Sequence, residues 1–430
     1  MILVVNPVHS LKGCVFLPAS KSYSIRAVLI AACGGISRLI NPSDCDDAKI
    51  AMSVAKYLGS DVRREKGKKW KMIAKCHRPN LAKINVGESG TVLRFLLPLL
   101  SLYQRKSTVV GEGTLQGRPN HHLLNTLRSR GVKIKGVGAK ESIPIRLSGG
   151  ELSAGKMEID GSLSSQFISA LLIACPQLKE NTQLMIQGKQ IVSADYVTMT
   201  LAVLKMAGIN IRPSGQRLFS IPGGQKFKGL KDFTVPSDYG LAAFLLAAGI
   251  LVKSDVTLEG HWNDKLVQAD GRILEFLSRM GVRISRTSRA IKLKGPIALK
   301  GGNFSLKDCP DLVPIMAVLA LFAKGPTRLS DIQHARAKES DRISDLRQEL
   351  LKVGADVREE KNVLIIHPRP AYRSNVLLDP HHDHRLAMAF AVLGLRVGTK
   401  IKDIECVSKS YPAFVKDIKS LHAQVLLKRS

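Results

Sequence analysis

Acidic residues are scarce in this 430-residue sequence: 35 Asp and Glu stand against 65 Lys and Arg, giving a formal net charge of +30. Such a charge is compatible with a nucleic-acid-binding protein. The densest basic run, residues 63–83, holds one Trp and no RNA-binding motif, and it alternates like a β-hairpin. Charge alone favours non-specific association and does not define a role, so we expect no nucleic-acid partner.

Long apolar runs and paired cysteines are also missing. The longest uncharged apolar run, residues 239–252, is shorter than the ~20 residues that a membrane helix needs. No basic leader precedes an apolar stretch, and residues 1–5 have the pattern of a strand. The seven cysteines show no CxxC spacing, which is typical of unpaired thiols in a reducing compartment. We therefore expect a cytoplasmic globular protein without a membrane partner.

What the sequence does contain is a repeated two-helix unit. Six segments rich in small and aliphatic residues follow polar residues, and they predict helices that begin near Ser20, Ser89, Ser164, Ser237, Pro310 and Asp383. Because these helices are apolar nearly all round, they should be buried. The period is about 70 to 75 residues, longer than that of common solenoid repeats.

A second, amphipathic helix closes each unit and is followed by glycine and a strand. The glycines are Gly59, Gly131, Gly208, Gly281 and Gly354, and a weaker sixth copy has Ala423 in this place. Glycine is favoured after a helix because it adopts φ > 0 without a Cβ clash. Three units fill residues 20–235 and three fill the rest, so each half has an ordinary domain size, with a hinge expected near 236.

Cationic and hydroxyl groups gather where the buried helices begin. Helix N-termini attract anions, so the repeated arrangement predicts a site for a multiply charged anionic ligand. The groups are Lys21, Ser22 and Arg26; Gly90 and Arg94; Ser164, Ser165 and Gln166; Ser193; and Arg385, together with Arg118 in a Gly-Arg-Pro loop. Ordinary helix capping is the structural alternative for the serines.

A few acids accompany these cations. Asp311 heads the fifth helix, and Glu339 lies in the charged run 336–342 with Arg336, Lys338 and Arg342. At helical spacing Lys338 and Arg342 share one face, and a solvated ion-pair helix is the alternative. The cations suit phosphates and carboxylates, and the two acids suit proton transfer.

Three histidines surround Asp383 in the run 381–385. Histidine and aspartate are ligands of Zn²⁺ and Fe²⁺, but adjacent residues point in different directions and an i, i+4 pair is missing. We therefore expect no metal.

The ordered motifs SKSYSIR, ESGTVLR, GRP, DGSLSSQF, PDLVP, RAKESDR, DHRLAM and SKSYP resemble the EPSP synthase (3-phosphoshikimate 1-carboxyvinyltransferase) family over essentially the whole length. The resemblance implies an α/β, two-lobed enolpyruvyl-transferase-like fold, each lobe having three βαβαββ units around a pseudo-threefold axis. It also implies that residues 1–19 join 236–430 in lobe 1, while 20–235 form lobe 2, with hinges near 19 and 236.

The resemblance further implies the reaction and its residues. The 5-hydroxyl of shikimate 3-phosphate would attack C2 of phosphoenolpyruvate (PEP), and the tetrahedral intermediate would lose phosphate, with Lys21, Asp311 and Glu339 as catalytic residues. Shikimate 3-phosphate would be held by Lys21, Ser22, Arg26, Ser164, Ser165, Ser193, Asp311 and Lys338. PEP would be held by Lys21, Gly90, Arg118, Gln166, Arg342, Arg385 and Lys409. No metal or organic cofactor is implied, and a monomer is expected.

Two residues depart from the family pattern: Glu88 and His334 stand where many members have Asn. Glu88 adds a negative charge near an anion site, which bears on substrate affinity and on sensitivity to glyphosate, the family's usual inhibitor.

Two alternative functions remain open at this point. UDP-N-acetylglucosamine 1-carboxyvinyltransferase shares the fold, but its loop before the Arg-Pro pair holds a cysteine, and residues 111–116 hold none. A non-catalytic basic scaffold that binds RNA is the other alternative, and the presence of Asp311 and Glu339 argues against it.

Because the candidate ligand-binding residues are split between the halves, we also expect a dianionic substrate to draw the two lobes together.

Overall fold

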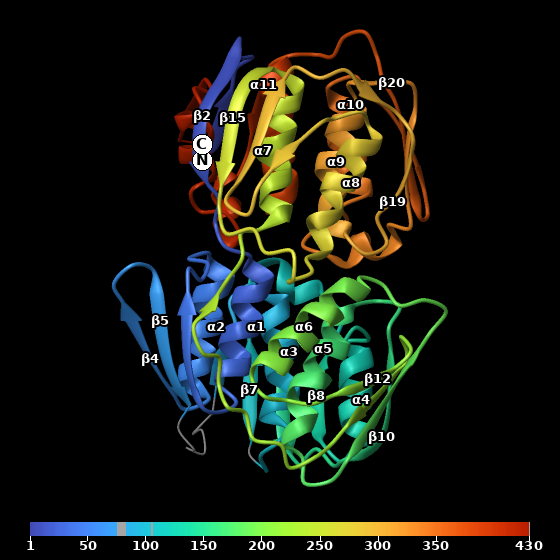
Figure 1. Cartoon of the computed structure of the whole chain (residues 1–430). Helices are drawn as coiled ribbons and strands as arrows, with labels where there is room; N and C mark the ends of the chain where they lie inside the picture. The colour runs from blue at the N-terminus through green and yellow to red at the C-terminus, as the bar shows by residue number, and fades with distance from the viewer. Residues whose placement is uncertain (75–82, 105, 430) are drawn as a thin grey trace. The chain divides into compact units, whose positions relative to one another are not determined.

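The computed structural model describes residues 1–74, 83–104 and 106–429 (Figure 1). The chain divides into two compact units, Met1–Ala19 with Pro236–Ser430, and Ser20–Val235. We call the first lobe 1 and the second lobe 2. Among the described residues, no helix combines the length and the apolar character needed to cross a membrane.

One four-stranded sheet recurs three times in the described part of each lobe. In each copy two parallel strands are followed by two antiparallel ones. In lobe 2 the sheets are β14-β3-β5-β4 (Phe233–Thr234, Ile36–Ile40, Lys69–Ala74, Ser60–Glu65), β6-β7-β9-β8 (Lys83–Asn85, Ser107–Val110, Ser142–Gly149, Lys133–Val137) and β10-β11-β13-β12 (Gly155–Asp160, Thr182–Gln187, Leu218–Ile221, Arg212–Ser214). The repeated order confirms the predicted α/β repeat.

Lobe 1 uses the N-terminal strands to complete its own sheets. These are β2-β15-β17-β16 (Ser10–Phe16, Lys253–Glu259, Ala290–Gly295, Ser285–Arg286), β19-β21-β23-β22 (Asn303–Ser305, Thr327–Ser330, Val363–His367, Asp356–Glu360) and β24-β25-β1-β26 (Val376–Leu378, Thr399–Ile401, Ile2–Val5, Val425–Lys428). A two-stranded ladder joins β18 (Leu299–Lys300) to β20 (Ala323–Lys324). The chain's first strands thus pair with segments from its last two hundred residues.

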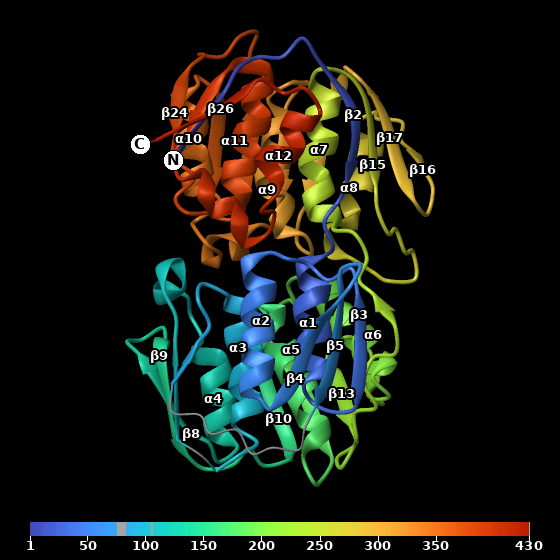
Figure 2. The ribbon, with the colours of Figure 1, turned by 90° about the vertical axis from the view of Figure 1, so that its left-hand side faces the viewer.

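The first helix of each unit lies inside its lobe. These helices are α1 (Lys21–Ala31), α3 (Gly90–Leu100) and α5 (Ser165–Ala174) in lobe 2, and α7 (Tyr239–Leu251), α9 (Val313–Ala320) and α11 (His384–Val397) in lobe 1. Every residue of α7 and α9 is buried. In lobe 2, α3 packs against α1 and α5, and in lobe 1, α11 packs against α7 and α9, with the sheets on the outside (Figures 1 and 2).

Side-chain caps start most of these helices close to where the sequence predicted. The caps are Ser20, Ser89, Ser164, Asp238 and Asp383. Asp238, not Ser237, caps α7, because its Oδ1 accepts from Leu241 N at 3.0 Å while Ser237 Oγ donates to Leu17 O. Helix α9 begins at Val313, after a 3₁₀ turn of Pro310–Leu312.

The second helices are α2 (Asp46–Tyr57), α4 (His121–Ser129), α6 (Ala194–Met206), α8 (Ile273–Arg279), α10 (Ser344–Lys352) and α12 (Phe414–Ser420). All five predicted glycines have positive φ, between 81° and 94°. The prediction for the sixth copy was wrong: His422, with φ 68°, adopts the left-handed conformation, and Ala423 is the next, buried residue. The chain turns there after Leu421, so the residue at the glycine position is His422.

The charged run 336–342 is not the helix that its spacing suggested. A 3₁₀ turn (η5, Gln333–Ala337) ends at Lys338, and α10 begins only at Ser344. The hairpin expected in the basic run is present as β4 and β5, while residues 75–82, including Cys76, lie outside the described residues. Cys14, Cys33, Cys45, Cys175 and Cys406 are free thiols.

Candidate active site

The start of α1 brings together hydroxyl and cationic groups. Ser20 caps the helix, and Lys21 and Ser22 are its first two residues. Lys21 Nζ lies 3.1 Å from Asp47 Oδ2 at the start of α2, so this carboxylate directs the lysine side chain. The sequence did not predict the role of Asp47, because an acid in the first turn of a helix is explained by the helix dipole alone.

Arg26 lies one turn further along α1 and is only 1% exposed. Its Nε donates to Thr200 Oγ1 at 2.8 Å, its Nη1 to Ser22 O at 3.0 Å and its Nη2 to Tyr196 O at 3.1 Å. The guanidinium also lies over the rings of Phe95 and Tyr196. Burial lowers the pKa of Arg26 to about 10, so the side chain stays cationic at neutral pH. Arg26 therefore ties α1 to α6 beside the predicted sugar-binding residues.

A second network links the starts of α3 and α5. Arg94 Nη1 donates to Gln166 Oε1 at 2.6 Å, and Gln166 Nε2 donates to Thr91 Oγ1 at 2.9 Å. The guanidinium of Arg94 lies over Phe167. This network fixes the amide of Gln166, whose orientation the sequence could not give because its partners are more than 70 residues away.

Arg118 follows the 3₁₀ turn η1 (Gly113–Gly117) and is 7% exposed. A Cβ on Gly90, the first residue of α3, would lie 2.7 Å from Arg118 Nη1, so the guanidinium covers this helix N-terminus. Asn120, fully buried, donates from Nδ2 to Arg118 O at 3.1 Å and accepts from Arg94 Nε at 3.3 Å. Asn120 is a positioning residue that the sequence did not predict. Its only sequence signal is its place directly after Gly117-Arg118-Pro119.

The hydroxyl groups of lobe 2 occupy helix starts. Ser164 caps α5 by accepting from Gln166 N, and Ser165 is 3% exposed. Ser193 precedes α6 with φ 55°, a left-handed conformation that a non-glycine residue rarely adopts. Such strain concentrates at functional sites, which supports a ligand-binding role for Ser193.

In lobe 1 the centre of the site is Arg342, with only 1% of its side chain exposed. Its Nη1 lies 2.6 Å from Asp311 Oδ1, its Nη2 2.9 Å from Glu339 Oε2 and its Nε 2.7 Å from Asp383 Oδ2. These three acids come from separate segments, and all raise the pKa of Arg342 against the effect of burial. Arg342 thus holds both predicted catalytic acids in one cluster.

Arg385 contacts the same cluster from the start of α11. Its Nη2 donates to Asp311 Oδ2 at 3.1 Å and its Nη1 to Gly240 O at 2.8 Å. Burial would raise the pKa of Asp311, but Arg342, Arg385 and Lys338 outweigh it and hold that pKa far below its usual range. Asp311 is therefore ionised, and it is a weak base while both arginines are bound to it.

Two further acids near Arg385 were missed by sequence reasoning. Asp238 caps α7, and Asp270, 6% exposed, lies in the 3₁₀ turn η3 (Ala269–Arg272). Burial, and then the charge of Asp311, raise the pKa of Asp270 to about 7. Asp238 also raises this pKa, whereas Arg385 and Lys338 lower it. Nothing in the local pattern around Asp270 distinguishes it from a surface acid.

Lys338, His334 and Lys409 lie around this cluster. Burial, and then Lys338, lower the pKa of His334 to about 3, so its ring is neutral at physiological pH. Lys409, the last residue of η6 (Ile404–Lys409), donates from Nζ to His382 O at 2.9 Å. Both His381 and His382 have positive φ, so the turn before Asp383 is strained.

The histidine run does not converge on a point. His381 Nε2 approaches Glu349 Oε1 at 3.4 Å, and His382 Nδ1 approaches Asp403 Oδ2 at 2.5 Å. Within the described residues, no group of three or more His, Cys, Asp or Glu side chains is arranged to hold a metal ion. His381 and His382 thus each have an acidic partner that orients the ring.

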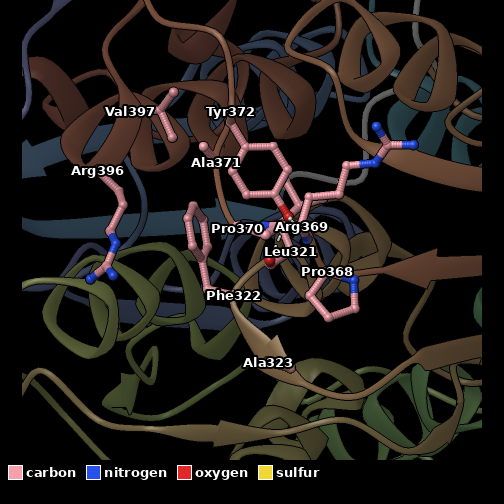
Figure 3. Close-up of a pocket in the computed structure, with 10 residues that line it drawn as sticks. All are labelled: Leu321, Phe322, Ala323, Pro368, Arg369, Pro370, Ala371, Tyr372, Arg396 and Val397. Atoms are coloured by element: carbon pink, nitrogen blue, oxygen red, sulfur yellow. Dashed lines mark hydrogen bonds between the residues drawn. The ribbon is translucent and has the colours of Figure 1, made fainter.

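A surface cavity of about 400 Å³ lies in lobe 1 at the C-terminal ends of α9 and α11 (Figure 3). It is lined by Phe322, Tyr372, Arg369, Arg396 and their neighbours. Arg396 donates to Leu251 O, and Arg369 faces Asp356 at 3.7 Å. Arg385 lies at the opposite, N-terminal end of α11 and Asp311 in the turn before α9, so this cavity is separate from these predicted site residues.

The predicted residues thus fall into two groups, one in each lobe. Lobe 2 holds Lys21, Ser22, Arg26, Gly90, Arg118, Ser164, Ser165, Gln166 and Ser193, and lobe 1 holds Asp311, Lys338, Glu339, Arg342, Arg385 and Lys409. Arg336, counted with the ligand-binding cations, belongs to neither: it binds Asp341 and Glu359 at 3.0 and 2.8 Å. These ion pairs indicate a structural role for Arg336, because the chain is not helical between η5 and α10 and directs this side chain to Asp341 and Glu359.

Comparisons with known proteins identify the family of the chain. Residues 5–418 match the sequence model of EPSP synthase (3-phosphoshikimate 1-carboxyvinyltransferase). The chain is 37% identical over 424 residues to the 3-phosphoshikimate 1-carboxyvinyltransferase of Methanosarcina mazei, covering 97% of both chains. It is 34% identical over 433 residues to that of Methanocaldococcus jannaschii, covering 99% of this chain and 100% of the relative.

Solved structures give the same result for the fold. The EPSP synthase of Acinetobacter baumannii superposes with a TM-score of 0.79 at 25% identity, covering 99% of this chain and all of that one. The enolpyruvyl transferase NikO from Streptomyces tendae superposes with a TM-score of 0.80 at 20% identity, covering 99% and 98% of the two chains, which is a likeness of fold.

Proposed function

Because the chain belongs to the EPSP synthase (3-phosphoshikimate 1-carboxyvinyltransferase) family, we propose that it transfers the enolpyruvyl group of PEP to the 5-hydroxyl of shikimate 3-phosphate and releases phosphate. This is the transferase step that leads to chorismate and the aromatic amino acids. The single observation that carries the proposal is the family match over residues 5–418. The clusters described above supply residues suited to each step.

PEP carries a phosphate and a carboxylate, and we assign them to the guanidinium and ammonium groups. Arg118 lies over the start of α3 at Gly90, and Arg342 and Arg385 share Asp311 in lobe 1. Planar guanidinium groups bind carboxylate and phosphate through paired hydrogen bonds. Lys21, Gln166 and Lys409 complete the proposed PEP-binding set.

Shikimate 3-phosphate presents hydroxyl, phosphate and carboxylate groups, and we assign it to the hydroxyl-rich helix starts. Ser164 and Ser165 open α5, and Ser193 precedes α6. Backbone N–H groups at helix starts bind phosphate oxygens. Lys21, Ser22, Arg26, Asp311 and Lys338 complete the proposed set.

Proton transfers to and from both acids accompany the bond changes. As the 5-hydroxyl adds to C2 of PEP, its proton goes to Asp311, and C3 gains a proton from Glu339. C3 then returns a proton to Glu339 as phosphate departs, and Asp311 gives the hydroxyl proton to the leaving phosphate, so both acids return to their starting states. When PEP takes hydrogen bonds from Arg342 and Arg385, Asp311 loses part of its stabilisation as an anion and becomes a stronger base. Lys21 offers a positive charge to the phosphate.

Phosphate release decides among the possible functions. The purified protein should release phosphate from PEP only when shikimate 3-phosphate is added. Release with UDP-N-acetylglucosamine instead would assign the sister activity, although residues 111–116 lack its loop cysteine. No release with either acceptor would contradict both enzymatic proposals and leave the RNA-binding scaffold.

A further inference from the structure

Glu88 lies between β6 and Ser89, the cap of α3. Its half-buried carboxylate is directed at the loop that precedes Arg118. Glu88 Oε2 accepts hydrogen bonds from Thr114 N at 3.0 Å and from Thr114 Oγ1 at 3.2 Å. The negative charge of Glu88 is therefore stabilised by hydrogen bonds from a neighbouring loop of the same lobe.

The loop 111–117 approaches Glu88 as closely as glycine allows. A Cβ on Gly113, which has φ 55°, would lie within 3.0 Å of both carboxylate oxygens of Glu88. A Cβ on Gly111 would lie 2.6 Å from Gly87 O, and Glu112 N donates to Gly87 O at 3.0 Å. Backbone and side-chain contacts thus fasten this loop to residues 87 and 88.

Thr114 passes this restraint on to Arg118. The hydroxyl donates its single proton to Glu88, so its oxygen lone pairs are available, and Arg118 Nη2 donates to Thr114 Oγ1 at 3.3 Å. The order is carboxylate, hydroxyl, guanidinium, and each bond polarises the next. Arg118 is thereby held over the start of α3, where Gly90 leaves room for it.

We propose that Glu88 is a positioning residue for PEP: through Thr114 it holds the loop 111–117 and so presents the Arg118 guanidinium to the anion. The proposal rests on the proposed function only for the identity of that anion. It contrasts with the expectation from charge alone, in which Glu88 repels PEP. Positioning of Arg118 by Glu88 would strengthen PEP binding, whereas repulsion would weaken it. Substitution of Glu88 therefore distinguishes the two effects.

Glu88→Ala should raise the KM for PEP about tenfold or more, the usual effect of removing hydrogen bonds to a charged group. The kcat should change by less than about threefold and calorimetric binding of shikimate 3-phosphate by less than about twofold, since neither depends mainly on the loop. Glu88→Gln keeps an acceptor oxygen and should recover most of the lost affinity. An unchanged or lower KM for PEP in Glu88→Ala would overturn the proposal, because repulsion or no coupling would then be the result.

Thr114→Val tests the relay, because it removes the hydroxyl and keeps the backbone N–H. It should raise the KM for PEP in the same direction, and the double variant with Glu88→Ala should be no worse than the weaker-binding single variant. Additive effects would overturn the relay. Glu112→Gln is the matched control: it removes an exposed charge from the same loop and should leave the KM unchanged.

Hydrogen exchange gives a readout that does not need turnover. The amides of residues 112–117 should exchange faster in Glu88→Ala than in the wild type or in Glu112→Gln. Equal protection in all three proteins would overturn the restraint. If the wild type released no phosphate from PEP, the proposed function would fail, and the exchange experiment would still decide whether Glu88 orders the loop.

Discussion

Glu339 shares Arg342 with Asp311 and Asp383, so three carboxylates are grouped around one buried guanidinium. Of the three, Asp383 is fully buried, whereas Glu339 and Asp311 keep 15% and 17% of their side chains exposed. Proton transfer needs an acid that reaches the substrate, which favours Glu339 and Asp311 over Asp383. At this scale, the position of an acid relative to Arg342 distinguishes a chemical role from a structural one.

Glu339→Gln should lower kcat by roughly 10²–10⁴, the usual contribution of a positioned acid or base. Glutamine keeps the size of the side chain and one acceptor for Arg342, so the fold should be retained. Steady-state phosphate release measures the effect, with thermal unfolding as the check on folding. Glu360→Gln, which changes an exposed acid in β22, is the matched control. A loss of less than about tenfold in a folded variant would remove Glu339 from the proton transfer.

Asp270 gives a pH prediction of definite sign. Its pKa is raised to about 7 in the folded protein from 3.8, so the unfolded state ionises first and stability falls as pH rises from about 4 to 7. Asp270→Asn removes this cost, so the variant should gain roughly 1–4 kcal/mol over the wild type at pH 7.5 and little at pH 4. Urea unfolding at the two pH values measures the difference. The exposed acid Asp255, changed to Asn, should show no such trend; a gain for Asp270→Asn that did not depend on pH would contradict the assignment.

At the scale of secondary-structure elements, the end of each second helix is set by one left-handed residue. Five units use glycine, and the sixth uses His422, which is exposed and has φ 68°. A side chain in that conformation costs free energy that glycine does not. The cap after α12 is therefore the least favourable of the six.

His422→Gly should stabilise the protein by about 1 kcal/mol, because glycine adopts the left-handed conformation without a Cβ clash. Ala423→Gly is the matched test of the residue first assigned to this position. It should destabilise, since Ala423 is buried and does not need a positive φ. Chemical denaturation measures both variants. Stabilisation by Ala423→Gly and not by His422→Gly would mean that the cap had been assigned to the wrong residue.

At the scale of the whole molecule, the residues proposed to bind the substrates are divided between lobe 1 and lobe 2. The chain crosses between the lobes at residues 19 and 236, next to a bridge that pairs Ala19 with Ser237. The chain has a net charge of +30 and each lobe holds some of the proposed ligand-binding cations, so like-charge repulsion is expected to oppose closure. A ligand with two or more negative charges reduces that repulsion, so it should favour a more compact arrangement.

Shikimate 3-phosphate should therefore lower the radius of gyration by rotating two rigid lobes about the crossings near 19 and 236. Small-angle X-ray scattering with and without ligand measures this. Inorganic sulfate at the same ionic strength is the control for simple charge screening. An unchanged radius at saturation, in a sample shown to be open when empty, would contradict closure.

The sequence by itself determined the features that depend on neighbouring residues. Ser20, Ser89 and Asp383 cap helices where polar residues meet apolar runs, and Gly59 and Gly131 mark helix ends, because capping and left-handed turns act within one or two helical turns. The repeat of these local signals gave the six units, and the ordered motifs gave the family.

Only the tertiary structure decided which side chains meet and in which charge state. Arg342 reaches Asp383 across 41 residues, and Arg26 reaches Thr200 across 174. The raised pKa of Asp270 depends on burial and on the charge of Asp311, neither of which a local pattern contains. The role of Glu88 likewise changed from an isolated negative charge to an acceptor for Thr114. The physical reason is that helix signals are short-range, whereas pairing, burial and the local electric field arise only when distant segments pack together.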